Sequence, residues 1–272
     1  MDKSRMIFRR FPSVLAALSA LVFLIGCATV PETGRRQLLL VSPGEEMSLG
    51  LTEFQKMKRN LPVSASPAEN ALVQKVGRRI AAVAPLPNAQ WEFVVFDDPK
   101  TANAFCLPGG KVGVYTGLLP ITKDEDGLAT VIGHEVSHAV ARHGAERISE
   151  GLLIQFGGEI LDAATSKKTD ATRALAAGAF GVFSQVGVAL PHSRTQESEA
   201  DHLGLIYMAR AGYDPRQAVE FWKRFADYNA KSGNHPIQFL STHPVDAVRI
   251  RQLENELPQA ISEFEKTSRE KR

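Results

Sequence analysis

The sequence predicts an α+β fold, in which a mainly helical body surrounds one apolar helix and a small sheet lies beside that helix. The first observation is the segment 127–143, which is apolar around most of a helical circumference and carries two histidines four positions apart. The second is the region 91–115, where short extended segments alternate with Pro and Gly turns. The third is the set of helix-start signals and helical apolar spacings before and after these regions.

Residues 1–26 are expected to be a lipoprotein signal peptide and not part of the fold. Basic side chains precede an apolar run over residues 14–25, which is too short for a permanent bilayer-spanning helix. The run ends at Leu24-Ile25-Gly26-Cys27, which resembles a bacterial lipobox, so cleavage before Cys27 would leave its thiol to carry diacylglycerol. An ordinary signal peptide with an incidental cysteine is the alternative.

The residue after the lipobox bears on localisation. Ala28 stands where Asp would signal a different destination, which resembles the default sorting of Gram-negative lipoproteins to the outer membrane. We therefore expect a lipid-anchored protein of the bacterial cell envelope, held at the outer membrane and facing the periplasm. The lipidated N-terminus and a polar tether would occupy residues 27–41, one folded domain residues 42–256, and a charged, frayed tail residues 257–272.

Charge and cysteine content narrow the functional classes. Removing residues 1–26 takes away four basic residues and Asp2, so the formal charge changes from +2 to −1. The remaining chain has no basic patch interleaved with aromatic residues, so nucleic acid is not an expected partner. Cys106 has no second cysteine to pair with once Cys27 is acylated, and it should pack as a small hydrophobe.

Helices and strands are expected in a regular order ahead of the central helix. A cap residue at Ser42 opens a first helix, and a second is expected over residues 67–83. Residues 91–96 and 103–107 are expected as strands, and Lys111–Tyr115 as a third. We expect this third strand at the edge of the sheet, where an extended substrate could pair with it.

The central helix carries the motif His134-Glu135-Val-Ser-His138. Histidines four apart lie one above the other on a helix face, so both imidazoles can reach one metal ion, and neutral imidazole suits zinc. Glu135 can take a proton from water that the metal activates, which is the chemistry of a hydrolase. A histidine pair that only packs or caps the helix is the alternative, but unpaired imidazoles and a carboxylate would be costly to bury in an apolar helix.

Two histidines on zinc need a third protein ligand from elsewhere. His143 lacks the glycine-containing spacing that brings a later histidine round to the metal, so we expect it on a helix face. A carboxylate remains, and Glu197 and Asp201 share one face of a helix expected over residues 196–211. Glu199 is the rival ligand, although apolar residues share its stripe of the helix.

Four blocks, taken in order, resemble the zinc endopeptidases of metallopeptidase family 48, which include HtpX and the CAAX prenyl protease. The similarity is greatest to the periplasmic lipoprotein branch and covers most of residues 35–255. The blocks are residues 103–110, residues 115–119, residues 134–138, and residues 193–201 followed by Gly204.

The resemblance implies a zincin-type (gluzincin) metalloprotease domain over residues 42–256. It implies one Zn²⁺ per chain, held by His134, His138 and Glu197. Glu135 would be the catalytic base. Asp201 would be an acidic helper that either orients a ligating imidazole or protonates the leaving amine.

The resemblance also implies a substrate class. Unfolded or misassembled envelope proteins would be cleaved in quality control, and the outer-membrane assembly machinery is a further partner that it suggests. The alternative is an envelope chaperone or assembly factor for outer-membrane proteins, in which proteolysis is secondary. In that case Glu135→Gln should leave the function intact, whereas a protease should lose it.

Three later features have open interpretations. Residues 174–191 lack charge, so a membrane-dipping segment is one reading, but a buried or site-covering helix after a turn at residues 167–170 is preferred. Gly204 either lets the two metal-bearing helices approach closely or is a tolerated mid-helix glycine. His243 either caps the last helix or occupies the open metal position as a plug, with Arg249 as a positive group near the cleft.

Overall fold

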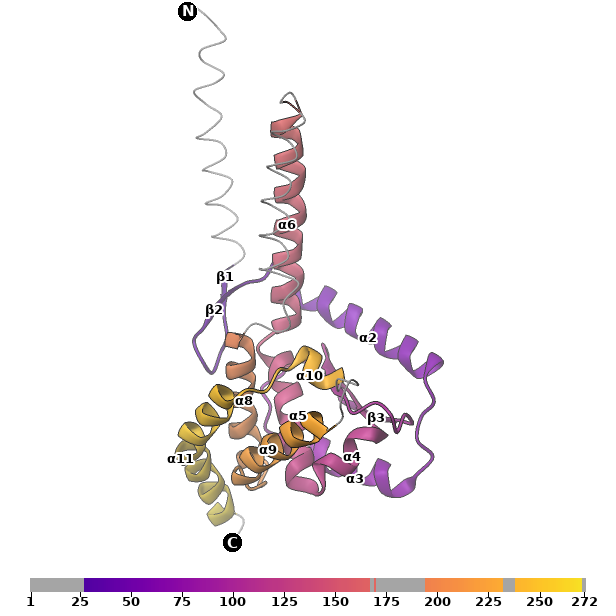
Figure 1. The fold of residues 1–272 in the computed structure, drawn as a ribbon, viewed down its shortest axis with the longest axis vertical. Helices are drawn as coiled ribbons and strands as arrows, with labels where there is room; N and C mark the ends of the chain where they lie inside the picture. The colour runs from indigo at the N-terminus through magenta and orange to yellow at the C-terminus, as the bar shows by residue number, and fades with distance from the viewer. Residues whose placement is uncertain (1–26, 167–168, 170–193, 232–237, 271–272) are drawn as a thin grey trace, which may run out of the picture.

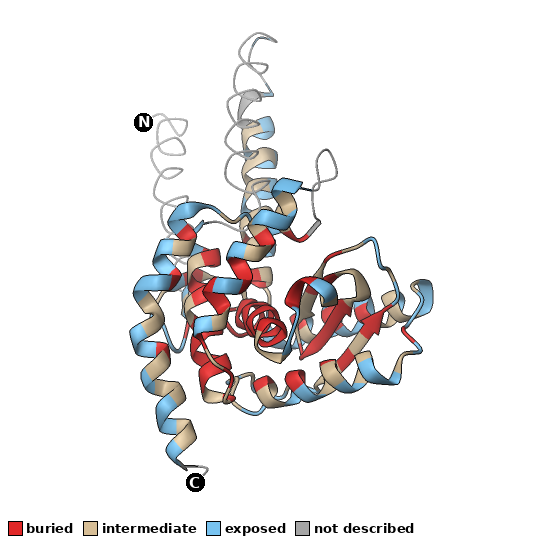
Figure 2. Cartoon of the chain, turned by 60° about the horizontal axis from the view of Figure 1, so that its bottom comes forward, coloured by how far each residue is buried: buried red, intermediate tan, exposed pale blue. Residues whose placement is uncertain are grey.

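The computed structural model describes residues 27–166, 169, 194–231 and 238–270 (Figure 1). The fold is built around helix α5 (Glu125–Val140), whose residues are buried from Gly127 onward. Helices α8 (Arg194–Arg210), α3 (Pro67–Ala81) and α9 (Arg216–Lys231) pack against it. Figure 2 shows the buried residues gathered in the middle of the molecule and the exposed ones on the outer helices. The α+β class is therefore as expected, with helices dominating.

Three of the helices begin where the sequence supplies a side chain that caps them. Helix α2 (Pro43–Asn60) starts after Ser42, which forms a reciprocal capping box with Glu45. Helix α3 starts after Ser66, whose hydroxyl accepts a hydrogen bond from the backbone N–H of Glu69. The Asp124 carboxylate accepts a hydrogen bond of 2.9 Å from the backbone N–H of Gly127, and this bond fixes the start of α5. The start of α5 in turn sets which faces its histidines occupy.

A three-stranded sheet lies beside α5, but its strand order differs from the expected one. Strands β3 (Glu92–Phe96) and β4 (Ala104–Leu107) flank β5 (Lys111–Tyr115), which is the central strand. The expectation of an edge strand at Lys111–Tyr115 was therefore wrong. Strand β5 pairs in parallel with β3, an arrangement that local pattern cannot reveal because it needs a crossover. The edge strand that contacts α5 is β4.

The segment expected as a tether is folded. Strands β1 (Cys27–Thr29) and β2 (Arg36–Leu38) form an antiparallel hairpin, and Val30 in its turn is fully buried in the core. Arg35 reaches two carboxylates on other elements, Glu146 and Glu199. These partners lie more than 100 positions away in sequence, so the segment looks like a polar linker when it is read locally.

Helix α6 (His143–Thr165) leaves the body and projects outward as one long helix (Figure 1). Leu153, Phe156 and Ile160 are 41–59% exposed, so this helix presents apolar side chains to solvent. Within the described residues, no helix combines the length and the apolar composition that crossing a bilayer requires. The uncharged stretch 174–191 and most of the expected turn at 167–170 fall outside the described residues.

The C-terminal segment is helical and does not fray as expected. After η1 (Thr116–Leu118), α4 (Leu119–Thr122) and α10 (Gln238–Thr242), helix α11 runs from Ala247 to Glu270 and contains Pro258. Leu253 and Ala260 are buried, and Leu257 and Phe264 pack against the core. Their spacing of three and four residues was present in the sequence, but the surrounding charges and the proline obscured it.

Candidate metal centre

Helix α5 supplies three of the side chains at the centre of the molecule. His134, Glu135 and His138 are 1%, 5% and 6% exposed, so none of them faces bulk solvent. The Nε2 atoms of the two histidines lie 3.1 Å apart and face the same point. Burial raises the pKa of the Glu135 carboxyl above its ordinary value. Its Oε1 atom is buried and has no hydrogen-bond partner among the described residues, which leaves it available for a ligand.

A close contact between two glycines brings α8 against α5. A Cβ atom on Gly204 would lie 3.0 Å from the backbone nitrogen of His134 and 3.2 Å from the carbonyl carbon of Gly133. The backbones can approach this closely only because neither residue has a side chain. Glu197, two turns before Gly204 on α8, is thereby carried to the His134–His138 pair. This geometry favours the close-approach reading of Gly204.

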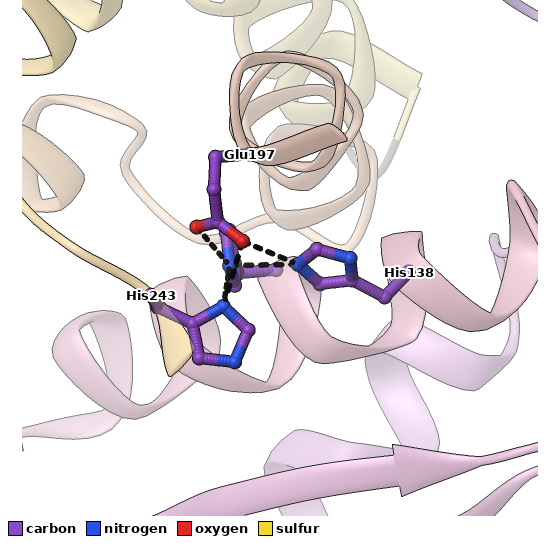
Figure 3. Close-up of side chains that lie close together, drawn as sticks. His138, Glu197 and His243 are labelled. Carbon is purple, nitrogen blue, oxygen red and sulfur yellow. Dashed lines mark hydrogen bonds and ion pairs between the residues drawn. The ribbon is translucent and has the colours of Figure 1, made fainter. Parts of the chain in front are cut away.

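Four buried side chains converge at one point, as Figure 3 shows for three of them. One donor atom from each of His134, His138, Glu197 and His243 lies within 4.8 Å of the others. His243 Nδ1 is 2.9 Å from Glu197 Oε1 and 3.2 Å from His134 Nε2. Three imidazoles and a carboxylate suit a tetrahedral zinc site, and a cluster of imidazole nitrogens so closely opposed needs a cation or proton between them. The donor set therefore fits a zinc ion.

His243 is neither a surface residue nor a simple cap. It is 4% exposed and comes from the segment between α10 and α11. Its ring stacks on Phe239 with centroids 4.4 Å apart, and its Nε2 lies 3.4 Å from Glu135 Oε1. The Phe239 contact, which local sequence pattern could not predict, holds the imidazole against the cluster.

Asp201 and Arg249 form a charged pair behind His134. Asp201 Oδ1 lies 3.0 Å from His134 Nδ1 and accepts a hydrogen bond of 2.8 Å from Arg249 Nη2. Arg249 Nη1 is 2.8 Å from Glu197 Oε2, and the guanidinium lies 4.3 Å from the Trp222 ring centroid. Burial acts to raise the pKa of Asp201, but the Arg249 charge and hydrogen bonds outweigh it, so the pKa is lowered. Asp201 is therefore held as a carboxylate.

His143 and Glu199 occupy the opposite side of the centre. His143 is fully buried at the start of α6, and its Nδ1 lies 2.7 Å from Nδ1 of His138. Its Nε2 is 2.9 Å from Glu199 Oε2. His143 lies in a helix, as expected, but it faces the interior because Arg142 adopts a left-handed conformation (φ 57°) that turns the chain and aims His143 inward. Glu199, the rival carboxylate, is not among the four converging side chains.

Comparison with known proteins assigns the fold and the centre to a family. The model of peptidase family M48 matches residues 67–257, a span that contains all four converging residues. The chain belongs to peptidase family M48. It is a metalloendopeptidase, as the names of its relatives in this family state for them.

Two kinds of M48 relative are similar to this chain. The mitochondrial metalloendopeptidase OMA1 of Schizosaccharomyces pombe is 34% identical over 93% of this chain and 74% of its own length. The human mitochondrial OMA1 is 30% identical over 85% of this chain and 46% of its own. The β-barrel assembly-enhancing protease of Yersinia pestis is 27% identical over 83% of this chain and 46% of its own. This chain thus matches less than half of the length of the last two relatives.

Proposed function

We propose that this M48 metalloendopeptidase is zinc-dependent and that its substrates are unfolded or misassembled proteins of the bacterial envelope. The observation that carries the zinc assignment is the convergence of His134, His138 and Glu197 beside the buried Glu135 carboxylate, whose Oε1 makes no hydrogen bond among the described residues. The three residues would hold one Zn²⁺. When bound, zinc polarises the scissile carbonyl and lowers the pKa of an adjacent water.

The remaining chemistry belongs to the side chains. Glu135 takes the proton of the attacking water and returns it to the nitrogen of the breaking peptide bond, and its raised pKa suits this exchange. Asp201 orients His134, since one of its oxygens lies at the His134 Nδ1 and both are engaged by Arg249. This favours the orienting role for Asp201 over donation of a proton to the leaving amine.

Glu135→Gln tests the assignment directly. The variant should keep stoichiometric zinc and its circular dichroism spectrum, while hydrolysis of casein falls by about 10²- to 10⁴-fold, since the base is removed and the ligands remain. A variant with parental casein hydrolysis would contradict the role of Glu135. The same variant separates a protease from an envelope chaperone, because refolding assistance to outer-membrane proteins should survive the substitution.

We further propose that an extended substrate pairs with β4 and not with β5. Asn103 O accepts a hydrogen bond from Tyr115 N, so alternation along the antiparallel pair turns the backbone N–H of Cys106 away from β5. Burial raises the pKa of the Cys106 thiol, and the nearby Glu135 charge raises it further. The effect of Glu135 indicates that Cys106 on β4 lies close to the site. Cys106→Pro should therefore raise KM without changing zinc content. An unchanged KM in the folded variant would exclude β4.

His243 is proposed to be a plug. Its Nδ1 lies among the converging donors, so it would fill the fourth position until substrate displaces the segment between α10 and α11. The alternative role, capping of α11, does not account for its contacts with Glu197 and Glu135.

Lipid anchoring through Cys27 is the proposed route to the envelope membrane. The supporting observations are the lipobox-like residues before Cys27 and the similarity to the β-barrel assembly-enhancing protease of Yersinia pestis. Cys27→Ser should leave unprocessed precursor on immunoblots of fractionated cells. Normally processed, membrane-bound protein in that variant would refute the anchor.

A further inference from the structure

A continuous chain of buried polar contacts leads from His138 to the N-terminal hairpin. His138 Nδ1 and His143 Nδ1 are 2.7 Å apart, and His143 Nε2 is 2.9 Å from Glu199 Oε2. Arg35, between β1 and β2, donates from Nε to the same Glu199 oxygen at 2.7 Å. Four side chains from α5, α6, α8 and the hairpin are thus joined in series.

The direction of each hydrogen bond follows once Nε2 of His138 is assigned to the metal. That nitrogen then carries no proton, so Nδ1 of His138 must carry one and donate it to Nδ1 of His143. His143 consequently carries its own proton on Nε2 and donates it to the Glu199 carboxylate. With the proton of His138 on Nδ1 and the proton of His143 on Nε2, each of these hydrogen bonds has one donor and one acceptor. The opposite assignment would leave His138 Nδ1 as an acceptor and would point a proton of Nε2 at the cluster.

The hairpin holds the far end of the chain firmly. The Thr33 hydroxyl donates to Glu199, and the guanidinium of Arg35 also donates to both oxygens of Glu146, at 2.7 and 2.9 Å. Gln196 donates to Glu146 at 2.7 Å, which ties this carboxylate to α8. A planar guanidinium that engages two buried carboxylates fixes both of them with little freedom.

The two metal-facing histidines are therefore supported differently. His134 contacts a carboxylate directly, through Asp201. Nδ1 of His138 instead meets the imidazole of His143, whose other nitrogen meets the Glu199 carboxylate, and this carboxylate is held by Arg35 of the N-terminal hairpin. The mechanism above leaves His143, Glu199 and Arg35 without a role, although all three lie in this buried network.

We propose that His143, Glu199 and Arg35 are positioning residues that fix the tautomer and orientation of His138, so that the N-terminal hairpin is part of the zinc site. This inference rests on the proposed binding of zinc by the His134–His138–Glu197 cluster. Because outer partners of metal-bound histidines typically contribute 10- to 100-fold to metal affinity, the loss of this support should be measurable as a change in zinc Kd.

The test compares zinc affinity, measured by chelator competition on the full chain, across matched variants. His143→Ala should raise the zinc Kd by about 10- to 100-fold. His143→Asn should recover part of the loss, since an amide oxygen near the position of Nδ1 can still accept from His138. Arg35→Ala should also raise the Kd. Arg210→Ala is the control, because Arg210 holds Glu32 of the same hairpin turn at 3.2 Å without reaching His138.

A spectroscopic readout separates positioning from general destabilisation. In the zinc-loaded parent, imidazole nitrogen spectra should show a protected Nδ1–H on His138, and His143→Ala should lose that protection while His134 keeps its own. Should His143→Ala and Arg35→Ala both bind zinc within twofold of the parent, the positioning role is refuted and zinc binding stands. Should the parent itself fail to bind zinc, the proposed function falls and this inference falls with it.

Discussion

The contact between α5 and α8 leaves no room for a side chain at Gly204, so Gly204→Ala should force the two helices apart. The added Cβ would meet three backbone atoms of α5 at 3.0–3.2 Å, and backbone cannot rotate away as a side chain could. Overpacking of this kind costs about 1–3 kcal/mol. Replacing a mid-helix glycine by alanine returns about 1 kcal/mol through helix propensity, so the expected net change runs from near zero to about 2 kcal/mol of destabilisation.

Gly151→Ala on α6 isolates the packing part of this effect. A Cβ there meets nothing within 4 Å, so this variant should gain helix propensity alone. The difference in unfolding free energy between the two variants then equals the overpacking cost of about 1–3 kcal/mol. At this chain length it corresponds to roughly 2–12 °C in Tm. Urea and thermal unfolding followed by circular dichroism would measure it. A Gly204→Ala protein as stable as Gly151→Ala would refute the close approach.

Three further predictions concern the centre itself. In metal analysis, Glu197→Ala should lose zinc more completely than Glu199→Ala, because Glu197 is a proposed metal ligand whereas Glu199 only contacts His143. The reverse order would make Glu199 the third ligand. His243→Ala should raise basal peptidase activity and autolysis at unchanged zinc content, and a fall in activity would make His243 a transition-state donor instead. Burial acts to raise the pKa of Glu199, but hydrogen bonds from His143, Thr33 and Arg35 lower it from 4.5 to about 2. Its ionised form therefore stabilises the fold above pH 4.5, and this contribution is lost as the pH falls towards 2, so Glu199→Gln should flatten the pH dependence of unfolding across that window.

Local pattern predicted the elements whose causes are local. The start of α2 after Ser42 follows from its cap, and the strand β5 coincides with the expected range Lys111–Tyr115. The position of His134 and His138 on one helix face follows from their spacing alone. In the structure Glu197 lies in the converging group and Glu199 does not.

The features that local pattern missed depend on distant partners. The hairpin is ordered by Glu146 and Glu199, and the turn that aims His143 inward depends on a left-handed Arg142, which is an uncommon conformation for arginine. The central position of β5 depends on a parallel pairing with β3, and β4 lies between these two strands in sequence but not in the sheet. A polar residue read in isolation predicts solvent exposure, so Arg35 carried no sign that it would be partly buried between two carboxylates.

The reach of Arg35 has a consequence for when the protein can become active during its synthesis. Its bond to Glu199 joins residues 164 positions apart, so the hairpin is made early and cannot dock until Glu199 has been made. At translation rates of roughly 5–20 residues per second, this wait is about 10–30 s. Contacts of such long range form late because chain closure must precede them. A nascent chain that ends before Glu199 would thus carry the His134–His138 pair without this support, and full zinc affinity would arise only after the hairpin has docked.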